Sequence, residues 1–404
     1  MWQPNALSGV KVLDFTQFIA GPLVTRLMAE LGAEVIKVEL APDGDNSRKL
    51  PNFKDGRSAY FVQHNLGKKS LCLDISRPEA RELLLKLVET TDVVVENFSP
   101  GIIGRFGLGW DVVRQRNPWA IMCSISAFGQ QGELSRLRGF DFIAQSYSGI
   151  TSVIGEPDRA PSIAGAAIGD TGTGIMAYAA IATALYTRAK PGGTGQFLDM
   201  ALIDFYMQCH EINVQMVSTS GGAVVPGRTG SQHNVVCPFG LFPCKDGGYV
   251  MITCLGEHWR LLCKAMDRPE MADDPRYADN AARMKNQAEV VAAVTRWTGG
   301  LDLAEVAERL ERGKVPCAPM LTVDQVMRQP HLVERGTVRA IEDPVFGKFQ
   351  VPGMPLRFSA FPPRDPGRAP FLGQHNAEIL AGVGVDAGAV RALTEAGVLI
   401  EKRV

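Results

Sequence analysis

The residue with the clearest potential for covalent chemistry is Asp170. It follows the small, nearly apolar run AGAAIG and precedes TGTG and a long, nearly uncharged helix. Because the flanking residues are small, a substrate could approach the carboxylate oxygens closely, so Asp170 is the best candidate nucleophile in the chain. The same position also suits a helix N-cap, the commonest role of an Asp before a helix. This stretch alone favours capping over catalysis.

The elements that must position Asp170 follow a βαβ pattern. Apolar runs predict strands at 10–16, 34–39, 69–75, 92–98 and 120–126, and amphipathic periodicity predicts helices at 20–32, 78–91 and 110–117. Short connections of this kind imply parallel strands with right-handed crossovers. The fold class is therefore predicted to be α/β, with an open, doubly wound, Rossmann-like sheet.

Ligands of such sheets bind beyond the carboxyl ends of the strands. The segments to search are therefore those that follow the strands, at 16–22, 37–48, 96–107 and 126–132. The first strand is followed by DFTQFIAGP instead of GxGxxG, which disfavours a nicotinamide dinucleotide. The sequence also contains no GxxxxGK[ST] phosphate-binding loop.

The length of 404 residues predicts more than one domain. A strand FLDM and a helix at 201–219 complete the first lobe, and a loop rich in Gly and Pro at 220–231 then breaks the pattern. An antiparallel hairpin is expected in 240–255, around Asp246-Gly247-Gly248. We expect a large domain over 1–220, a smaller α+β domain over 221–325, and a C-terminal segment, 326–404, that rejoins the large domain.

Charge and cysteine usage exclude several classes of function. The 42 basic and 43 acidic residues give a net charge of −1, which argues against binding of nucleic acid or a membrane surface through bulk charge. The eight Cys and six His show no metal-ligand spacing, so no metal site is expected, and several Cys lie in apolar runs typical of buried, reduced thiols. Without a signal-like N-terminus or an 18-residue apolar run, the chain is expected to be cytoplasmic and soluble.

Several motifs occur in an order that resembles the class III CoA-transferases, the family of formyl-CoA and carnitine CoA-transferases. They are LSGVKVLDFTQFIAGP with LGAEVIKVE, NLGKKSLCLDI, DVVVENFSPGIIGRFGLGW, SISAFGQQG, RGFDFIAQSYSG, the Asp170 segment, GGTGQFLDMALID, VPCAPMLTVDQV with QPH and ERG, and FLGQHNAEIL. These blocks span nearly the whole chain, so the resemblance is more specific than any single motif.

The resemblance implies transfer of CoA from an acyl-CoA thioester to a free carboxylic acid through aspartyl anhydride and aspartyl-CoA thioester intermediates. The nucleophile of that family aligns with Asp170, which raises catalysis above capping as its expected role. CoA thioesters are then substrates, with succinyl-CoA as one candidate donor, and no permanently bound cofactor is expected. Water competes with the acceptor for such intermediates, so they must be sheltered.

CoA carries phosphates at one end and a neutral pantetheine arm at the other, so the family's site needs cations at its mouth and backbone donors within. The candidates by position are Gln17, Ala20, Lys37, Lys68, Lys69, Arg105 and Arg138. Any single Lys or Arg is more often a solvated surface charge. Placement after strand ends and the resemblance favour Lys37, Arg105 and Arg138 over the other two lysines.

A mobile Gly-rich loop shelters the intermediate in several members of the family. Its counterpart here, 253–262, reads TCLGEHWRLL and has the single glycine Gly256. A plain helix start at Gly256-Glu257-His258 explains this segment equally well. The sequence therefore does not determine which residues shield the site.

Two other functions compete with acyl transfer. An α-methylacyl-CoA racemase, which resembles the first lobe, carries a histidine in the block matching RGFDF, where this chain has Phe140 and so lacks a general base. An acyl-CoA thioesterase or a non-catalytic acyl-CoA binding protein is the other alternative. The resemblance also implies a homodimer of two interlocked chains, with small-molecule substrates as the other partners.

Overall fold

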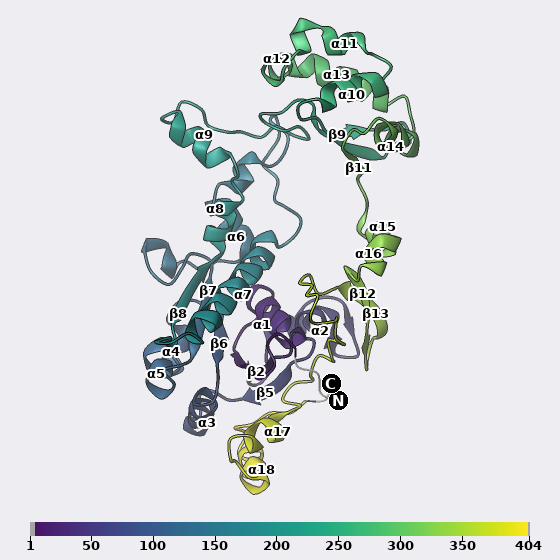
Figure 1. Cartoon of the computed structure of the whole chain (residues 1–404). Coiled ribbons are helices and arrows are strands. Elements are labelled where there is room, and N and C mark those ends of the chain that lie inside the picture. Colours follow the sequence, from purple (N-terminus) through teal and green to yellow (C-terminus); the bar gives the residue numbers. More distant parts are fainter. Residues whose placement is uncertain (1–4, 403–404) are drawn as a thin grey trace. The chain divides into compact units, whose positions relative to one another are not determined.

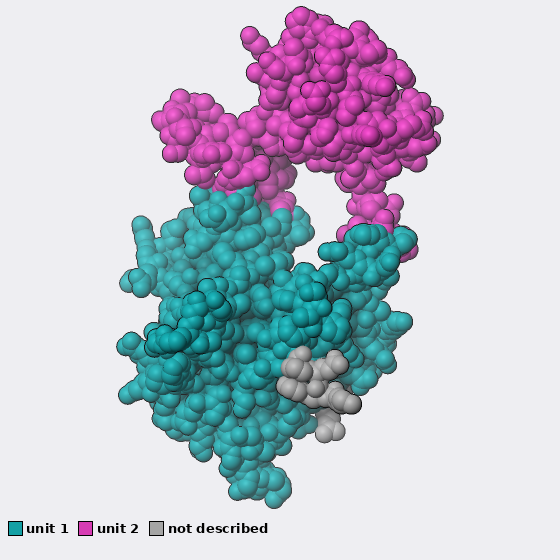
Figure 2. All heavy atoms as spheres, viewed as in Figure 1, with its two compact units in different colours: residues 1–148, 165–209, 330–404 teal, residues 149–164, 210–329 magenta. Residues whose placement is uncertain are grey.

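The computed structural model describes residues 5–402, and the chain divides into two compact units (Figures 1 and 2). Unit 1 takes in the described parts of 1–148, 165–209 and 330–404, and unit 2 comprises 149–164 and 210–329. The predicted domains and these units divide the chain differently in three places. The first lobe of unit 1 ends at residue 209, where the prediction has 220, and unit 2 ends at residue 329, where the prediction has 325. The excursion of 149–164 into unit 2 has no counterpart in the sequence prediction.

Unit 1 is organised around a six-stranded sheet with the order β5-β2-β1-β6-β7-β8. The strands are β1 (Lys11–Asp14), β2 (Glu34–Leu40), β5 (Lys69–Leu73), β6 (Val93–Glu96), β7 (Ile121–Ser126) and β8 (Phe197–Ala201). Every neighbouring pair is parallel, which confirms the predicted parallel α/β sheet. The strand order reverses at β1, so the topological switch point lies between β1 and β6.

Helices cover both faces of this sheet because its strands are apolar on both sides. On one face, α3 (Pro78–Val88), α5 (Trp110–Arg116), α17 (Asn376–Ala381) and α18 (Ala387–Glu395) share a buried cluster with alternate strand residues such as Leu13, Leu71 and Val94. Helices α1 (Ala20–Glu30) and α7 (Ile168–Arg188) pack against each other, and both contact strands of the sheet. The three helices predicted between the strands are confirmed, each ending one to three residues earlier than predicted.

The remaining helices and strands of unit 1 lie outside the central sheet and the helices already described. They are β3 (Phe53–Lys54), β4 (Arg57–Ser58), α2 (Ala59–His64), α4 (Ile102–Arg105), α6 (Asp141–Tyr147), α8 (Leu202–Gln208), α16 (Pro330–Glu334) and the hairpin of β12 (Val338–Asp343) and β13 (Gly347–Pro352). The prediction of one helix over 201–219 is wrong, because α8 ends at Gln208 and α9 (Asn213–Thr219) begins after a break. Unit 1 gives way to unit 2 at this break.

Unit 2 contains a three-stranded antiparallel sheet with the order β11-β10-β9. Its strands are β9 (Phe239–Pro243), β10 (Tyr249–Thr253) and β11 (Cys317–Pro319), and its longer helices are α10 (His258–Ala265), α13 (Gln287–Thr298) and α14 (Leu303–Arg312). The pairing of Pro243 with Tyr249 confirms the hairpin predicted around Asp246. Helix α10 begins at His258, so the sequence around Gly256 does start a helix.

All eight cysteines are free thiols, six of them buried. No described helix combines the length and apolar character needed to cross a membrane. Within residues 5–402 no group of His, Cys, Asp and Glu side chains is arranged to hold a metal ion.

Candidate active site

A cleft of about 320 Å³ opens in unit 1 at the carboxyl ends of the parallel strands. Its walls come from the turn after β1, the turn after β6, the end of β7, the segment before α6, the first turn of α7 and the start of α8. The lining residues are Gln17, Phe18, Ala20, Asn97, Phe98, Ser99, Pro100, Ile125, Ser126, Ala127, Phe128, Ser135, Leu137, Arg138, Gly139, Phe140, Asp170 and Leu202. The cleft therefore lies where ligands of doubly wound sheets bind.

Gln17 and Asn97 join the two strand ends at the switch point. The Gln17 N–H donates to Asn97 Oδ1 over 2.7 Å, and Asn97 Nδ2 donates to the Gln17 carbonyl over 2.8 Å. Gln17 Oε1 accepts a further bond of 2.7 Å from Asn46 Nδ2. Both the backbone and the side chain of Gln17 are thus held in place at the floor of the crevice.

Two phenylalanines form an aromatic wall of the cleft. Phe18 has φ of +66°, a left-handed conformation that costs a non-glycine residue on the order of 1 kcal/mol. Asp45 Oδ1 accepts its N–H over 3.3 Å, and its ring meets Phe140 edge to face with a centroid separation of 5.9 Å. Phe140 is 66% exposed.

Asp170 is the third residue of α7, whose N-cap is Ala167. The N-cap interpretation of Asp170 is therefore wrong. Its carboxylate makes no hydrogen bond or ion pair with another residue of the described chain. Its N–H donates to Asp141 Oδ2 over 2.7 Å. Burial, and secondarily the charge of Asp141, raise the pKa of Asp170 to about 7. A carboxylate destabilised in this way, at a cleft wall, is typical of a functional site.

Asp141 and Tyr206 occupy the N-terminal end of α7 in place of a capping side chain from α7 itself. Tyr206 Oη donates to Asp141 Oδ1 over 2.5 Å and accepts the Gly169 N–H over 3.0 Å. A third bond of 3.2 Å comes from Gln145 Nε2. Because Asp141 Oδ2 takes the Asp170 N–H, two successive amides of the first turn of α7 are satisfied from α6 and α8.

The glycines around Asp170 allow close packing of α7 against its neighbours. A Cβ at Gly169 would lie 2.3 Å from the Tyr206 ring, and one at Gly172 would lie 1.9 Å from the Phe205 ring. A Cβ at Gly174 would approach the Ala20 carbonyl oxygen to 2.8 Å. These glycines therefore allow α7 to pack closely on α8 and α1. The sequence interpretation had assigned the small residues around Asp170 only the role of giving a substrate access to the carboxylate.

The structure brings four of the eight predicted site residues together. Gln17, Ala20, Arg138 and Asp170 all line the cleft. The Arg138 side chain is exposed and has no hydrogen-bond or ion-pair partner among residues 5–402. It is therefore a cation that a bound anion can reach.

Lys68 lies in a fully buried network below the sheet end. Its ammonium contacts Asp14 Oδ2 at 2.9 Å and donates to Asn65 Oδ1 at 2.9 Å and to the Pro22 carbonyl at 3.1 Å. Burial alone would raise the pKa of Asp14, but Lys68 and Lys37 together with nearby hydroxyls lower it to about 2. Burial lowers the pKa of Lys68 to about 8, although the negative charge of Asp14 acts to raise it.

Lys37 is likewise buried, with its ammonium 2.8 Å from Asp45 Oδ2 and donating to the Thr16 carbonyl at 2.8 Å. Burial alone would lower its pKa, but Asp45 and Asp14 raise it above the ordinary value. Neither Lys37 nor Lys68 lines the cleft. The contact of these two lysines with CoA stays a prediction. Such a contact would require the ion pairs Lys37–Asp45 and Lys68–Asp14 to break.

Lys69 and Arg105 also lie away from the cleft wall. Lys69 pairs with Glu34 at 2.7 Å and with Glu378 at 2.8 Å. Arg105 is exposed at the end of α4. Their predicted contacts with CoA phosphates remain predictions.

The sequence interpretation missed three residues of the site. Asn97 lies inside the segment 96–107 that follows a predicted strand, so its position was indicated but its type was not singled out. Asp141 directly follows Phe140 in the RGFDF block, but only Phe140 was singled out there. Tyr206 lies 36 residues after Asp170 on a separate helix, and no pattern in the sequence links the two.

Comparison with known proteins identifies the family. The profile of CoA-transferase family III matches residues 7–376. A succinyl-CoA:mesaconate CoA-transferase from Haloarcula marismortui is 35% identical over 397 residues, covering 96% of this chain and 98% of that protein. A formyl-CoA:oxalate CoA-transferase from Streptomyces avermitilis is 35% identical over 414 residues, covering 98% and 100%. The crystal structure of a CAIB/BAIF family protein from Brucella suis has a TM-score of 0.82 and 34% identity, covering 94% of this chain and 100% of that one. The chain belongs to CoA-transferase family III.

Proposed function

We propose that this transferase uses Asp170 as a covalent nucleophile to move CoA from an acyl-CoA thioester to a free carboxylic acid. The observation that carries this proposal is a carboxylate with no internal partner, at the wall of the switch-point cleft of a CoA-transferase. The alternative of proton abstraction lacks a base at Phe140, whose phenyl ring packs on Phe18.

The proposed reaction consists of four substitutions at carbonyl carbons. The Asp170 carboxylate attacks the thioester carbonyl and expels CoA thiolate, giving a mixed anhydride. The thiolate then attacks the Asp170 carbonyl carbon, releasing the donor acid and leaving an aspartyl-CoA thioester. The acceptor carboxylate attacks this thioester, and the freed thiolate attacks the acceptor's carbonyl in the second anhydride, which restores Asp170 and gives the new acyl-CoA.

We assign the CoA-facing contacts to Gln17, Ala20 and Arg138, which line the cleft with Asp170. Backbone groups at the strand ends suit the amides of pantetheine, and the exposed Arg138 suits a phosphate or a substrate carboxylate. Short acids, with succinyl-CoA as donor, are proposed because relatives of 35% identity are named for succinyl-CoA with mesaconate and for formyl-CoA with oxalate. The eight free cysteines suit the reducing cytoplasm.

The covalent intermediate is the direct test. Incubation with succinyl-CoA in the absence of an acceptor acid is expected to add the mass of CoA, less water, to the intact protein, and Asp170→Ala is expected to abolish the addition. An adduct that persists in Asp170→Ala would contradict the proposal. Steady release of free CoA without an acceptor would instead identify a thioesterase, and no reaction at all would identify a binding protein.

The rate of adduct formation is expected to depend on pH. Because burial and Asp141 raise the pKa of Asp170 to about 7, the nucleophilic carboxylate is the minor form below that pH. Single-turnover rates should therefore rise about tenfold per pH unit up to about pH 7 and level off above it. The dissociation constant of CoA, measured over the same range, serves as the control for binding. A flat rate profile between pH 5.5 and 7 would contradict this expectation.

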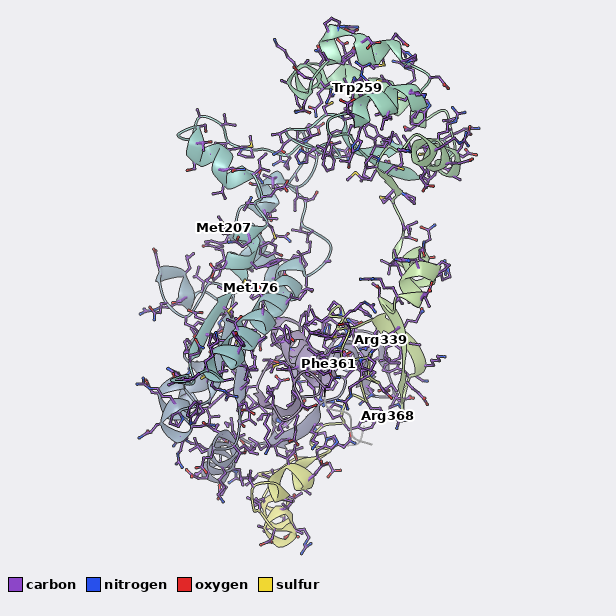
Figure 3. The ribbon with its side chains drawn as sticks, in the orientation of Figure 1. Met176, Met207, Trp259, Arg339, Phe361 and Arg368 are labelled. Carbon is purple, nitrogen blue, oxygen red and sulfur yellow. The ribbon has the colours of Figure 1, made fainter. Side chains whose placement is uncertain are left out.

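We further propose that the enzyme is a homodimer, in the interlocked form that the resemblance implies. Large apolar side chains are exposed on α6, α7 and α8 of unit 1: Phe142, Ile143, Tyr147, Ile168, Ile175, Tyr186 and Met207. Figure 3 shows Met176 on α7 and Met207 on α8. Monomers rarely expose so many on adjacent elements, so a second copy is expected to cover them. Native mass spectrometry is expected to give twice the 43.7 kDa chain mass, and a monomer would exclude the idea.

A further inference from the structure

Tyr206 is buried beside the nucleophile, and no step of the proposed reaction uses it. Among residues 5–402 it is the largest fully buried side chain, with 1% of its surface exposed. Its hydroxyl nevertheless has three partners: Asp141 Oδ1 at 2.5 Å, the Gly169 N–H at 3.0 Å and Gln145 Nε2 at 3.2 Å. A buried hydroxyl with this many partners is strongly oriented, since each lost bond would leave a polar group unsatisfied.

The direction of these bonds determines what the first turn of α7 can do. Tyr206 has one proton, which it donates to Asp141, so it must accept the Gly169 N–H and the Gln145 amide. Asp141 Oδ2 accepts the next amide, that of Asp170. The first-turn N–H groups that would otherwise stabilise an anion at the helix N-terminus are therefore already bound. They are unavailable to the Asp170 carboxylate.

We propose that Tyr206 is a positioning residue of the transferase reaction, which acts by locking Asp141 across the N-terminal turn of α7 so that the Asp170 carboxylate stays free and directed at the cleft. This inference rests on the proposed role of Asp170 as nucleophile. The Tyr206 ring also lies directly on Gly169, where a Cβ would be only 2.3 Å away. Ring contact and hydroxyl bonds together fix the turn.

The charged and titratable groups around Asp170 are few. Asp141 faces it from α6, Tyr60 from α2, and Arg138 shares the cleft wall. Removing the Tyr206 hydroxyl takes one donor from the Asp141 carboxylate and leaves the Gly169 N–H unpaired. With less of its charge satisfied, Asp141 would repel the Asp170 carboxylate more strongly, and the pKa of Asp170 would rise. Neutralising Asp141 would have the opposite effect.

The test compares Tyr206→Phe with Tyr178→Phe. Tyr178 lies within α7, outside the hydroxyl network, so its variant controls for loss of a tyrosine hydroxyl on this helix. Tyr206→Phe is expected to slow adduct formation about 10- to 100-fold, to change the dissociation constant of CoA by less than about threefold, and to move the pH midpoint of the rate upward. Tyr178→Phe is expected to match the wild type in all three.

Asp141→Asn provides the second variant if Tyr206→Phe does not fold. It keeps the shape of the side chain and is expected to move the pH midpoint downward, opposite to Tyr206→Phe, while also slowing the reaction. A wild-type rate and midpoint in either variant would overturn the inference, as would a parallel loss of CoA affinity and rate. Absence of an adduct on Asp170 of the wild type would instead overturn the proposed function, so the two failures are distinguishable.

Discussion

Asp170→Asn is expected to lower the rate of CoA transfer on the order of 10⁴-fold or more, while acyl-CoA binds with nearly unchanged affinity. The amide has the shape of the carboxylate but cannot form the anhydride, so only the chemical steps should be lost. Transfer is measured by mass spectrometry of the acyl-CoA product, and binding by calorimetry. Asp111→Asn, at a carboxylate 86% exposed on α5, is the matched control and should transfer CoA at the wild-type rate.

The stability of the same variant separates a catalytic from a structural role. In the folded protein the pKa of Asp170 is about 7, above its ordinary value of 3.8, so the folded state holds the proton more tightly than the unfolded state. The contribution of this group to stability therefore falls as pH rises from about 4 to about 7. Asp170→Asn removes that penalty and should raise the midpoint of thermal unfolding at pH 8 but not near pH 4. A lower midpoint at pH 8 would indicate a structural role.

Asp14→Ala is expected to destabilise the protein by about 3–5 kcal/mol, the typical cost of leaving one partner of a buried ion pair alone. Lys68 is fully buried and would lose the carboxylate 2.9 Å from its ammonium, and the hydroxyl of Thr25 would lose its bond of 2.6 Å to Asp14 Oδ2. Urea denaturation at pH 7 measures the change in the free energy of unfolding. Asp111→Ala, at an exposed ion pair, should cost less than about 1 kcal/mol.

The double variant with Asp14→Ala and Lys68→Met should regain part of this loss, because it removes the stranded charge along with its partner. The pH dependence has a defined sign as well. The folded pKa of Asp14, about 2, lies below its ordinary value of 3.8, so its contribution is present above about pH 4 and is lost as pH falls towards 2. A cost of Asp14→Ala within about 1 kcal/mol of zero would show that this network does not hold the sheet end together.

Periodicity predicted the parts of the fold that burial dictates. Strands such as Val93–Glu96 and Ile121–Ser126 are buried along their whole length and are mostly apolar, as expected for strands of a parallel sheet that is covered on both faces. The helices between them carry one apolar stripe each. The break between α8 and α9 was missed because 202–219 contains no Gly or Pro to mark it. The excursion of 149–164 was missed because loop paths leave no periodic signal.

The candidate site could be predicted only where local position was sufficient. Asp170 was identifiable from its own neighbours and from the resemblance. Lys37 and Lys68 were interpreted as cleft cations because they flank strand ends, yet their burial depends on Asp45 and Asp14, which other elements bring to them. Spacing in the sequence does not show which carboxylate will meet which ammonium.

The close packing of α7 against α8 and α1 leaves two kinds of residue around the cleft. Those in the first turns of α7 cannot be enlarged, whereas those in the surrounding loops can be exchanged. Gly169, Gly172 and Gly174 leave no room for even one methyl group against α8 and α1, so a larger residue at these positions would displace Asp170, the proposed nucleophile. The turn at 97–100 and the segment at 137–140 face the same cleft from loops. New acyl specificities would therefore arise by exchange of loop residues around a closely packed helix, and mutant libraries for new acids should be confined to those loops.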